Sequence, residues 1–175
     1  RKEKLEIARK LALLKVDVIE AGFPVASPGD FDSVKEIANE ISGSSIAGLA
    51  RALEKDIEAA ARALEKAESP RIHIFLSTSK THRDHKLQKN KSEIIKMATD
   101  AVRFGKNFCD DIEFSPEDAS RTEPKFLCEV VEAVISAGAK TVNIPDTVGY
   151  AVPDEFGALI TNLKQNVTNI NKAVI

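Results

Sequence analysis

The sequence predicts an α/β fold of parallel strands and covering helices, present as part of a (β/α)8 TIM barrel. One helix-like stretch separates each pair of strand-like runs, which begin near residues 16, 45, 71, 111, 141 and 172. Alternation of this kind builds right-handed βαβ units. A doubly wound sheet has the same order, but its dinucleotide-binding form needs a G-x-G-x-x-G turn that this sequence lacks. A whole barrel takes roughly 250 residues, so 175 residues predict a partial one.

The first part of the chain contains three strand-like runs. Residues 1–15 place apolar side chains at helical spacing between charges, which predicts an amphipathic helix rather than a signal peptide. The β-branched run VDVIEAGFP (16–24) predicts a strand, and the Pro, Gly and Asp that follow it predict a helix with Asp30 as N-cap. The pattern then predicts a buried strand at 44–51, a helix at 52–68 and an alternating strand at 71–79.

The basic stretch KTHRDHKLQKNK (80–91) interrupts this pattern, with Asp84 as its one acidic residue. Two interpretations stay open for it: a solvated loop leading into a helix, or a contact with an anionic ligand such as a nucleotide-bearing cofactor. The alternation then resumes with a helix (91–108), a strand from 111, a helix ending at Gly138 (123–138), a strand (140–147), a helix (153–167) and the start of a strand in KAVI.

The stretch DDIEFSPEDASRTEP (110–124) carries the most informative alternation. Side chains of a strand point to opposite faces in turn, so Ile112 and Phe114 share an apolar face. Glu113, Ser115 and Glu117 share the other face. We expect this polar row to face the interior of the barrel, where the carboxyl ends of the strands carry the chemistry.

Other strands deliver polar groups to the same end. His73 and Ser77 alternate with an apolar set, Pro145 and Thr147 end a later strand, and Glu20 and Arg51 end the first two strands. Plainer interpretations remain: His73 as an interior histidine, Glu20 and Arg51 as a structural ion pair, Glu113 as the neutralising partner of an arginine. Asp110, Asp111 and Asp118 are expected to be solvated loop or cap residues. Ser77 to Ser79 are expected to bond the backbone.

Bulk composition excludes several classes of protein. The formal net charge is −2 and no concentrated basic face is indicated, so we expect no nucleic-acid partner. No apolar run approaches about 20 residues, so we expect no membrane span. The two cysteines, Cys109 and Cys128, are too few for a disulfide framework or a cysteine-rich zinc site, and we expect a cytoplasmic protein.

Five segments together resemble a known family: IEAGFPVASPGDF, LAR, RIHIFLSTS, EFSPEDASRTEP and NIPDTVGY. Their order and rough spacing are similar to those of the catalytic barrel of the 2-isopropylmalate synthases. These belong to the acyl-CoA-condensing, metal-dependent barrel family that also holds homocitrate and citramalate synthases. The resemblance extends over residues 1–175, and it implies a partial catalytic TIM-barrel domain with about strands 2 to 6 and the start of strand 7, truncated at both ends.

The resemblance implies an acyltransferase of leucine biosynthesis. Acetyl-CoA would lose a methyl proton, and the enolate would attack the ketone of 2-oxoisovalerate to give 2-isopropylmalate and CoA. On the family pattern, Glu117 takes part in proton handling, together with groups outside this chain. Substrate contacts carry over to His73, Ser115, Pro145 and Thr147, and to Arg51.

The resemblance also implies a divalent metal, Mn²⁺ or Mg²⁺, with Zn²⁺ as a further alternative. The family's metal-binding Asp and H-x-H segments are absent from this sequence, so we expect the metal ligands to lie outside it. The chain alone is then expected to be inactive and an intact parent active. We expect acetyl-CoA and a 2-oxo acid as partners, and a homodimer or higher homo-oligomer.

Alternatives to this function remain open. A citramalate or homocitrate synthase would share most of the strand-end residues, although the second carboxylate of a homocitrate-type substrate would want a cation that the fifth and sixth strands do not offer. A lyase of the same barrel family would release acetyl-CoA rather than consume it. The remaining alternatives are a phosphate-binding barrel isomerase and a truncated product without function.

Overall fold

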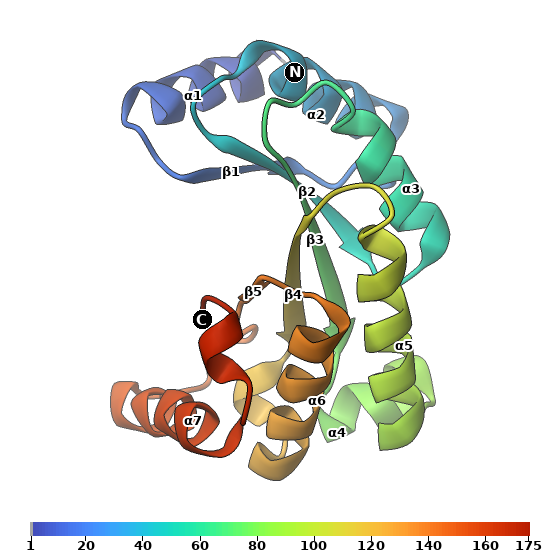
Figure 1. The fold of residues 1–175 in the computed structure, drawn as a ribbon, viewed down its shortest axis with the longest axis vertical. Helices are drawn as coiled ribbons and strands as arrows, with labels where there is room; N and C mark the ends of the chain where they lie inside the picture. Colours follow the sequence, from blue (N-terminus) through green and yellow to red (C-terminus); the bar gives the residue numbers. More distant parts are fainter. Residues whose placement is uncertain (1) are drawn as a thin grey trace. The chain divides into compact units, whose positions relative to one another are not determined.

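The computed structural model describes residues 2–175, and Figure 1 shows the alternation of strands and helices that the sequence predicts. The sheet has the strand order β1-β2-β3-β4-β5, with β1 pairing β2 and β4 pairing β5 in parallel. Sequential order with helical connections is the arrangement of a (β/α)8 barrel, so the predicted fold class is confirmed. The strands are β1 (Val18–Gly22), β2 (Ser45–Arg51), β3 (Pro70–Ser77), β4 (Asp111–Glu117) and β5 (Thr141–Val142).

Helices connect these strands. The α-helices are α1 (Lys2–Leu13), α2 (Pro28–Glu40), α3 (Glu54–Ala63), α4 (Lys80–His82), α5 (Lys91–Gly105), α6 (Pro124–Ala137) and α7 (Pro153–Asn166). A π-helical turn, η1 (Arg83–Leu87), follows α4, and two 3-10 turns are η2 (Ala119–Arg121) and η3 (Ile170–Lys172). Within residues 2–175, none of the helices is both long and apolar enough to cross a bilayer.

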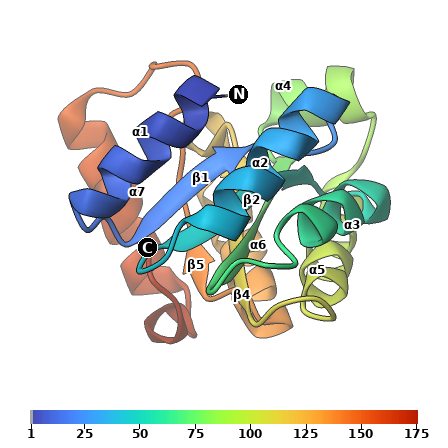
Figure 2. The same ribbon diagram turned by 90° about the horizontal axis from the view of Figure 1, so that it is seen from above.

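The chain divides into two compact units. The first unit contains the chain up to Ile74 together with Phe104–Ile112. In this unit α1 and α2 pack on β1, and α3 packs on β2 (Figure 2). Gly48 of β2 lies so close to α3 that an added Cβ would come within 3.3 Å of Leu64, so the missing side chain permits this packing.

The second unit contains Phe75–Arg103 and Glu113–Ile175. β4 and β5 pair with Glu113 opposite Thr141 and Phe114 opposite Val142. Phe114 and Phe126 are among the largest fully buried side chains. α6 supplies most of the apolar packing from its buried face: Phe126, Leu127, Cys128, Val130, Val131, Val134 and Ile135.

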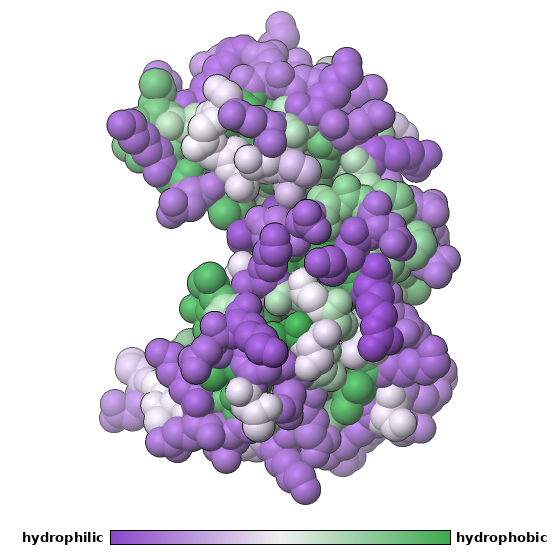
Figure 3. All heavy atoms as spheres, viewed as in Figure 1, coloured by the Kyte–Doolittle hydropathy of each residue, from purple (hydrophilic) through white to green (hydrophobic). Residues whose placement is uncertain are grey.

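Most of the surface over the helices in Figure 3 is hydrophilic, with smaller apolar areas between.

The predicted strand faces agree with the burial in the structure. Ile112 and Phe114 are fully buried, as are Ile72 and Ile74 in β3. The period of two in the sequence therefore identified the apolar set of β3 and of β4 that is buried.

Three local details differ from the sequence-based expectation. Ser27, not Asp30, is the N-cap of α2: its Oγ accepts the Asp30 N–H at 3.1 Å, and Asp30 lies three positions into the helix. β5 is only two residues long, and Pro145, which soon follows it, has no N–H for a strand ladder. The basic stretch forms α4 and η1 rather than a loop.

Candidate functional site

Glu117 ends β4 with its side chain held between two donors. Ser77 at the end of β3 donates its hydroxyl to Glu117 Oε2. The Lys86 ammonium donates to Oε1 at 3.1 Å and to Oε2 at 2.9 Å. Burial by itself raises the pKa of Glu117, but the hydrogen bonds from Lys86 and Ser77 outweigh it, so the net pKa lies below its ordinary value. Glu117 is therefore a carboxylate, not a carboxylic acid, at neutral pH.

The backbone next to Glu117 is fixed as well. The Thr78 N–H donates to the Glu117 carbonyl at 3.0 Å. The hydroxyls of Thr78 and Thr122 lie 2.7 Å apart, and Thr122 also donates to the Asp118 carbonyl at 3.0 Å. Thr78 and Thr122 are buried, so these contacts anchor the strand end that carries Glu117. Thr78 and Ser79 bond the backbone as the sequence led us to expect: the Thr78 hydroxyl donates to the Glu117 carbonyl at 3.4 Å, and Ser79 Oγ accepts the His82 N–H at 3.4 Å. The Ser77 hydroxyl instead bonds the Glu117 side chain.

Thr147 lies in the loop after β5, and its hydroxyl is oriented by the same segment. The Asp118 N–H donates to Thr147 Oγ1 at 2.9 Å. Asp118 adopts a left-handed conformation with φ of 66°, which is uncommon for a residue other than glycine. Because Oγ1 already accepts from Asp118, its own proton remains available for donation to a ligand.

The Asp118 carboxylate holds this turn in place. It is fully buried, and Arg121 donates to both of its oxygens, at 2.7 and 2.8 Å. Burial raises the pKa of Asp118, but the hydrogen bonds from Arg121 and Ser79 lower it by more, so the net pKa lies below its ordinary value. Asp118 is the N-cap residue of η2, as one of the two expectations for it had it, but its side chain is buried rather than solvated.

The loop from β5 to α7 is closed by Asp146. Its carboxylate accepts the Ser120 hydroxyl at 2.7 Å and the N–H groups of Tyr150 and Ala151 at 3.1 and 3.0 Å. The hydrogen bond from Ser120 is the main reason that the pKa of Asp146 is lowered. Thr147 thus belongs to a loop with defined backbone geometry.

Ser115 and Pro145 are also placed in the second unit. Ser115 is buried in β4, and Pro145 is half-buried in the loop after β5. The Pro145 carbonyl accepts the Ser120 N–H at 3.4 Å. The second unit therefore contains four of the sequence-predicted site residues, at the ends of β4 and β5.

His73, Arg51 and Glu20 belong to the first unit. His73 is buried, and its Nδ1 is hydrogen-bonded to the Glu20 carboxylate. Arg51 pairs with the buried Asp56, with its Nε 2.6 Å from Oδ2, and its guanidinium lies 5.7 Å from the centre of the Phe23 ring. The expected ion pair between Glu20 and Arg51 therefore does not form. Glu20 bonds His73 instead, and Arg51 pairs with Asp56 at the start of α3.

Most of the cations in the basic stretch 80–91 form ion pairs with carboxylates. Lys80 pairs with Asp84 at 2.5 Å, and Lys89 with Glu93 at 2.9 Å. Arg83 is buried and binds Glu123 through two nitrogens, at 2.9 and 2.8 Å. Lys86 was missed as a site residue in the sequence. The available signal was its position three residues after Arg83, which places the two on one helical face.

Metal binding requires His, Cys, Asp or Glu side chains that converge. Within residues 2–175, no three such side chains are placed to hold a metal ion together. The described residues therefore do not make up a metal centre on their own.

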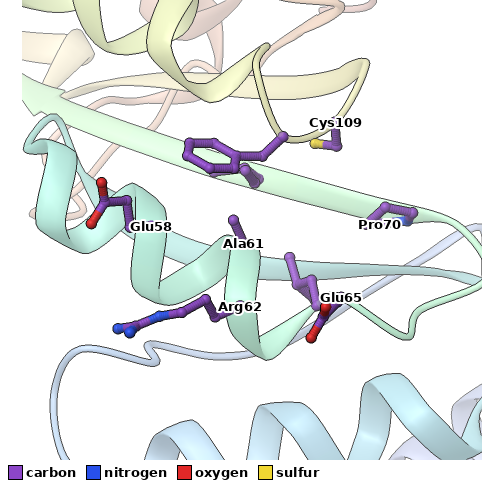
Figure 4. Close-up of a pocket in the computed structure, with 9 residues that line it drawn as sticks. Glu58, Ala61, Arg62, Glu65, Pro70 and Cys109 are labelled. Carbon is purple, nitrogen blue, oxygen red and sulfur yellow. The ribbon is translucent and has the colours of Figure 1, made fainter.

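Two of the cavities within residues 2–175 lie near other elements. One has a volume of about 440 Å³ in the first unit, where Glu58 and Arg62 project from α3, Glu65 follows the end of that helix, and Pro70 and Cys109 lie opposite (Figure 4). Pro70 begins β3, so this cavity lies at the amino end of the strand, away from the polar strand ends. The other, of about 620 Å³, is lined by the starts of α6 and α7 and the loop around Tyr150. None of the sequence-predicted site residues lines either cavity.

Sequence comparison finds 2-isopropylmalate synthases among the relatives of this chain. The HMGL-like family model matches residues 1–175. The chain is 59% identical over 176 residues to the 2-isopropylmalate synthase of Thermosynechococcus vestitus and 58% identical over 173 residues to that of Pyrococcus furiosus. It is 54% identical over 173 residues to that of Dictyoglomus turgidum. Each comparison covers 99% of this chain but 33%, 35% and 34% of the relative, so the chain spans about a third of their length.

Solved structures share the fold at lower identity. A hydroxymethylglutaryl-CoA lyase from Pseudomonas aeruginosa matches with a TM-score of 0.74 and 18% identity, over 95% of this chain and 57% of that one. The lyase from Bacillus subtilis matches with a TM-score of 0.70 and 19% identity, over 94% and 57%. These likenesses concern the fold.

Proposed function

The chain belongs to the HMGL-like family, and from that premise we propose that it is part of the catalytic domain of a 2-isopropylmalate synthase. The observation that carries this proposal is the 54–59% identity to synthases of that name over 99% of the chain. The motifs EFSPEDA and NIPDTVGY, which carry Glu117 and Thr147, lie within the matched residues.

The reaction proposed for the complete polypeptide is a condensation followed by hydrolysis. A base removes a proton from the methyl group of acetyl-CoA, and the electron pair of that C–H bond becomes the nucleophile. It forms a carbon–carbon bond to the ketone carbon of 2-oxoisovalerate, whose oxygen becomes an alkoxide and takes up a proton. Water then cleaves the thioester, releasing CoA and 2-isopropylmalate.

Glu117 is the residue of this chain that we assign to the proton transfer. A general base must be ionised before it can accept a proton, and the lowered pKa of Glu117 keeps it ionised at neutral pH. Its exposed fraction of 21% leaves a carboxylate edge accessible to a ligand. Glu117 acts together with groups that this chain does not contain.

Thr147 is assigned to the 2-oxo acid, with Ser115, Pro145, His73 and Arg51 as further substrate contacts. Thr147 is exposed, and its hydroxyl accepts from the Asp118 N–H, which leaves the hydroxyl proton to donate to a carboxylate or carbonyl oxygen. Donation to a developing negative charge is the usual way in which such a hydroxyl assists carbonyl chemistry.

The choice of an acceptor with an apolar side chain rests on charge. A second substrate carboxylate needs a cation when it is buried. Lys86, beside the ends of β3 and β4, has its ammonium bonded to Glu117 and Ser77, and Arg51 is paired with Asp56. 2-Oxoisovalerate, which carries an isopropyl group in place of a second carboxylate, is therefore the acceptor that we propose over 2-oxoglutarate.

The proposal extends to the setting of the enzyme. Residues 1–175 form one part of a larger catalytic domain, which acts in the cytoplasm as a homodimer or higher homo-oligomer and requires Mn²⁺, Mg²⁺ or Zn²⁺.

The test is acetyl-CoA-dependent thiol release by the complete polypeptide. 2-Oxoisovalerate, pyruvate and 2-oxoglutarate are each offered with divalent metal and after chelation. We expect a preference for 2-oxoisovalerate that chelation abolishes. A preference for pyruvate or 2-oxoglutarate would make the protein a different synthase, and cleavage that releases acetyl-CoA would make it a lyase.

A further inference from the structure

Lys86, Ser77 and Glu117 form a closed set of hydrogen bonds. Lys86 Nζ lies 3.0 Å from Ser77 Oγ and 2.9 and 3.1 Å from the two Glu117 oxygens, and the Ser77 hydroxyl bonds Glu117 Oε2. Nothing in the family resemblance or in the comparisons assigns a role to Lys86. Its contacts are made to the carboxylate to which the proposed function gives the proton transfer.

The direction of each bond in this set is fixed by chemistry. A lysine ammonium has three donors and no acceptor, so Ser77 Oγ must accept from Lys86. The single proton of Ser77 is then left for Glu117 Oε2. The carboxylate thus receives donors on both oxygens, which restricts its rotation more than either donor alone.

The turn that carries Lys86 is anchored independently of Glu117. η1 is a π-helical turn that ends at Gln88 in the left-handed region, and π turns often occur at functional sites. Arg83, three residues before Lys86, is buried and donates to the Thr78 carbonyl and to both Glu123 oxygens. Its guanidinium also lies 4.8 Å from the centre of the Phe126 ring.

We propose that Lys86 is a positioning residue, which acts through Ser77 and by direct contact to fix the Glu117 carboxylate for proton transfer. This inference rests on the proposed function. Lys86 is not assigned to substrate, because its ammonium donates to Ser77 and to both Glu117 oxygens.

Removal of the ammonium has a directional consequence. Burial raises the pKa of Glu117, and Lys86 is the stronger of the two donors that lower it. Lys86→Met keeps the aliphatic stem but removes the charge, so the pKa of Glu117 must rise and the carboxylate must lose one of its two restraints. Lys86→Arg keeps the charge and the ability to donate.

The first readout is the pH profile of kcat/KM in the complete enzyme. For Lys86→Met we expect the acidic limb to move to higher pH and kcat to fall about 10- to 100-fold, the size of effect that misplacement of a reacting group produces. The KM for the 2-oxo acid should change little. Lys86→Arg should return the acidic limb toward its original pH. Lys89→Met is the matched control, because Lys89 loses the same charge but pairs with Glu93 on the surface.

The second readout does not depend on catalysis. Carbon-13 NMR of labelled glutamate carboxyl groups in the same protein follows the titration of Glu117, whose signal is identified by its loss in Glu117→Gln. We expect its midpoint to be higher in Lys86→Met and unchanged in Lys89→Met. An unchanged midpoint in Lys86→Met would overturn the inference.

The two readouts separate two failures. If the complete enzyme releases no thiol with any 2-oxo acid, the proposed function fails. A raised Glu117 midpoint in Lys86→Met would then still establish that Lys86 lowers the pKa of Glu117, but a role of Lys86 in proton transfer would be rejected. If the enzyme is active and Lys86→Met has the wild-type acidic limb, the positioning role is rejected while the proposed function stands.

Discussion

Glu117 accepts hydrogen bonds from residues that are far away in the sequence. Ser77 lies 40 positions before it and Lys86 lies 31 positions before it. These donors lower the pKa of the carboxylate, whereas burial alone would raise it. At the scale of single residues, the chemistry therefore depends on the neighbours of Glu117 as much as on Glu117 itself.

Glu117→Gln tests the proposed base directly. The amide has nearly the same shape but cannot accept the proton, so kcat should fall about 10²- to 10⁴-fold, the usual contribution of general acid–base catalysis. The measurement is thiol release by the complete enzyme at saturating 2-oxo acid. Glu129→Gln, an exposed change on α6, is the control and should retain full activity. A Glu117→Gln enzyme with the wild-type kcat would exclude this residue as the base.

Thr147→Val and Thr147→Ser separate the hydroxyl from the methyl group of Thr147. Valine removes both the donor offered to the substrate and the acceptor of the Asp118 N–H. A lost hydrogen bond of about 0.5–1.5 kcal/mol should raise the KM for the 2-oxo acid about 2- to 12-fold. Serine should keep KM near that of the wild type. Equal KM values for valine and serine would show that the hydroxyl makes no contact with substrate.

Elements of the second unit are joined by a small number of buried polar contacts. Arg83 of η1 reaches Glu123, the N-cap residue of α6, and so fixes the π turn to that helix start. A hydrogen bond from Arg83 is the main reason that the pKa of Glu123 falls to about 2. Because this pKa is below the ordinary value of 4.5, the contact stabilises the folded state fully above pH 4.5.

Acid titration of stability tests this contact. Its contribution should disappear as the pH falls from 4.5 toward 2, since protonated Glu123 no longer pairs with Arg83. Glu123 is partly exposed, so after allowance for solvent screening we expect on the order of 1 kcal/mol. Urea unfolding of the wild type and Glu123→Gln should differ by this amount at pH 6 and converge near pH 2. A constant difference across this range would contradict the assignment.

The end of α6 requires a residue that can adopt a positive φ. Gly138 has φ of 117° and donates its N–H to the carbonyls of Val134 and Ile135. Gly138→Ala should therefore destabilise the fold by about 1–2 kcal/mol. Gly157→Ala is the matched control, since Gly157 lies within α7 with open space around its Cβ position, and alanine there should be neutral or stabilising. The measurement is the urea midpoint of each variant, and equal midpoints would contradict the argument.

At the scale of the whole molecule, the chain spans about a third of the length of its 2-isopropylmalate synthase relatives. Residues 2–175 place no three potential ligands around a metal ion. We expect the 175 residues by themselves to release no thiol above a blank in the presence of Mn²⁺ or Mg²⁺, while the complete polypeptide does so. A metal-dependent rate comparable to that of the complete polypeptide would contradict this expectation.

The sequence by itself determined the order of elements and the buried face of each strand. Both follow from local rules: apolar spacing near 3.6 predicts helices, and a period of two places Ile112 and Phe114 on one face and Glu117 on the other. The motifs around Glu117 and Thr147 also indicated the family, because the residues that carry the resemblance are contiguous in sequence.

Only the tertiary structure decided which charged groups meet. Glu20 bonds His73, which lies 53 positions away, and Arg51 turns to Asp56 rather than to Glu20. Asp118 is buried by a left-handed turn that nothing in its neighbours requires. Lys86 reaches Glu117 from the π turn η1, although the two residues are 31 positions apart in the sequence. Electrostatic partners are selected by distance in space, and distance between remote segments is set by the packing of strands and helices, which no local pattern encodes.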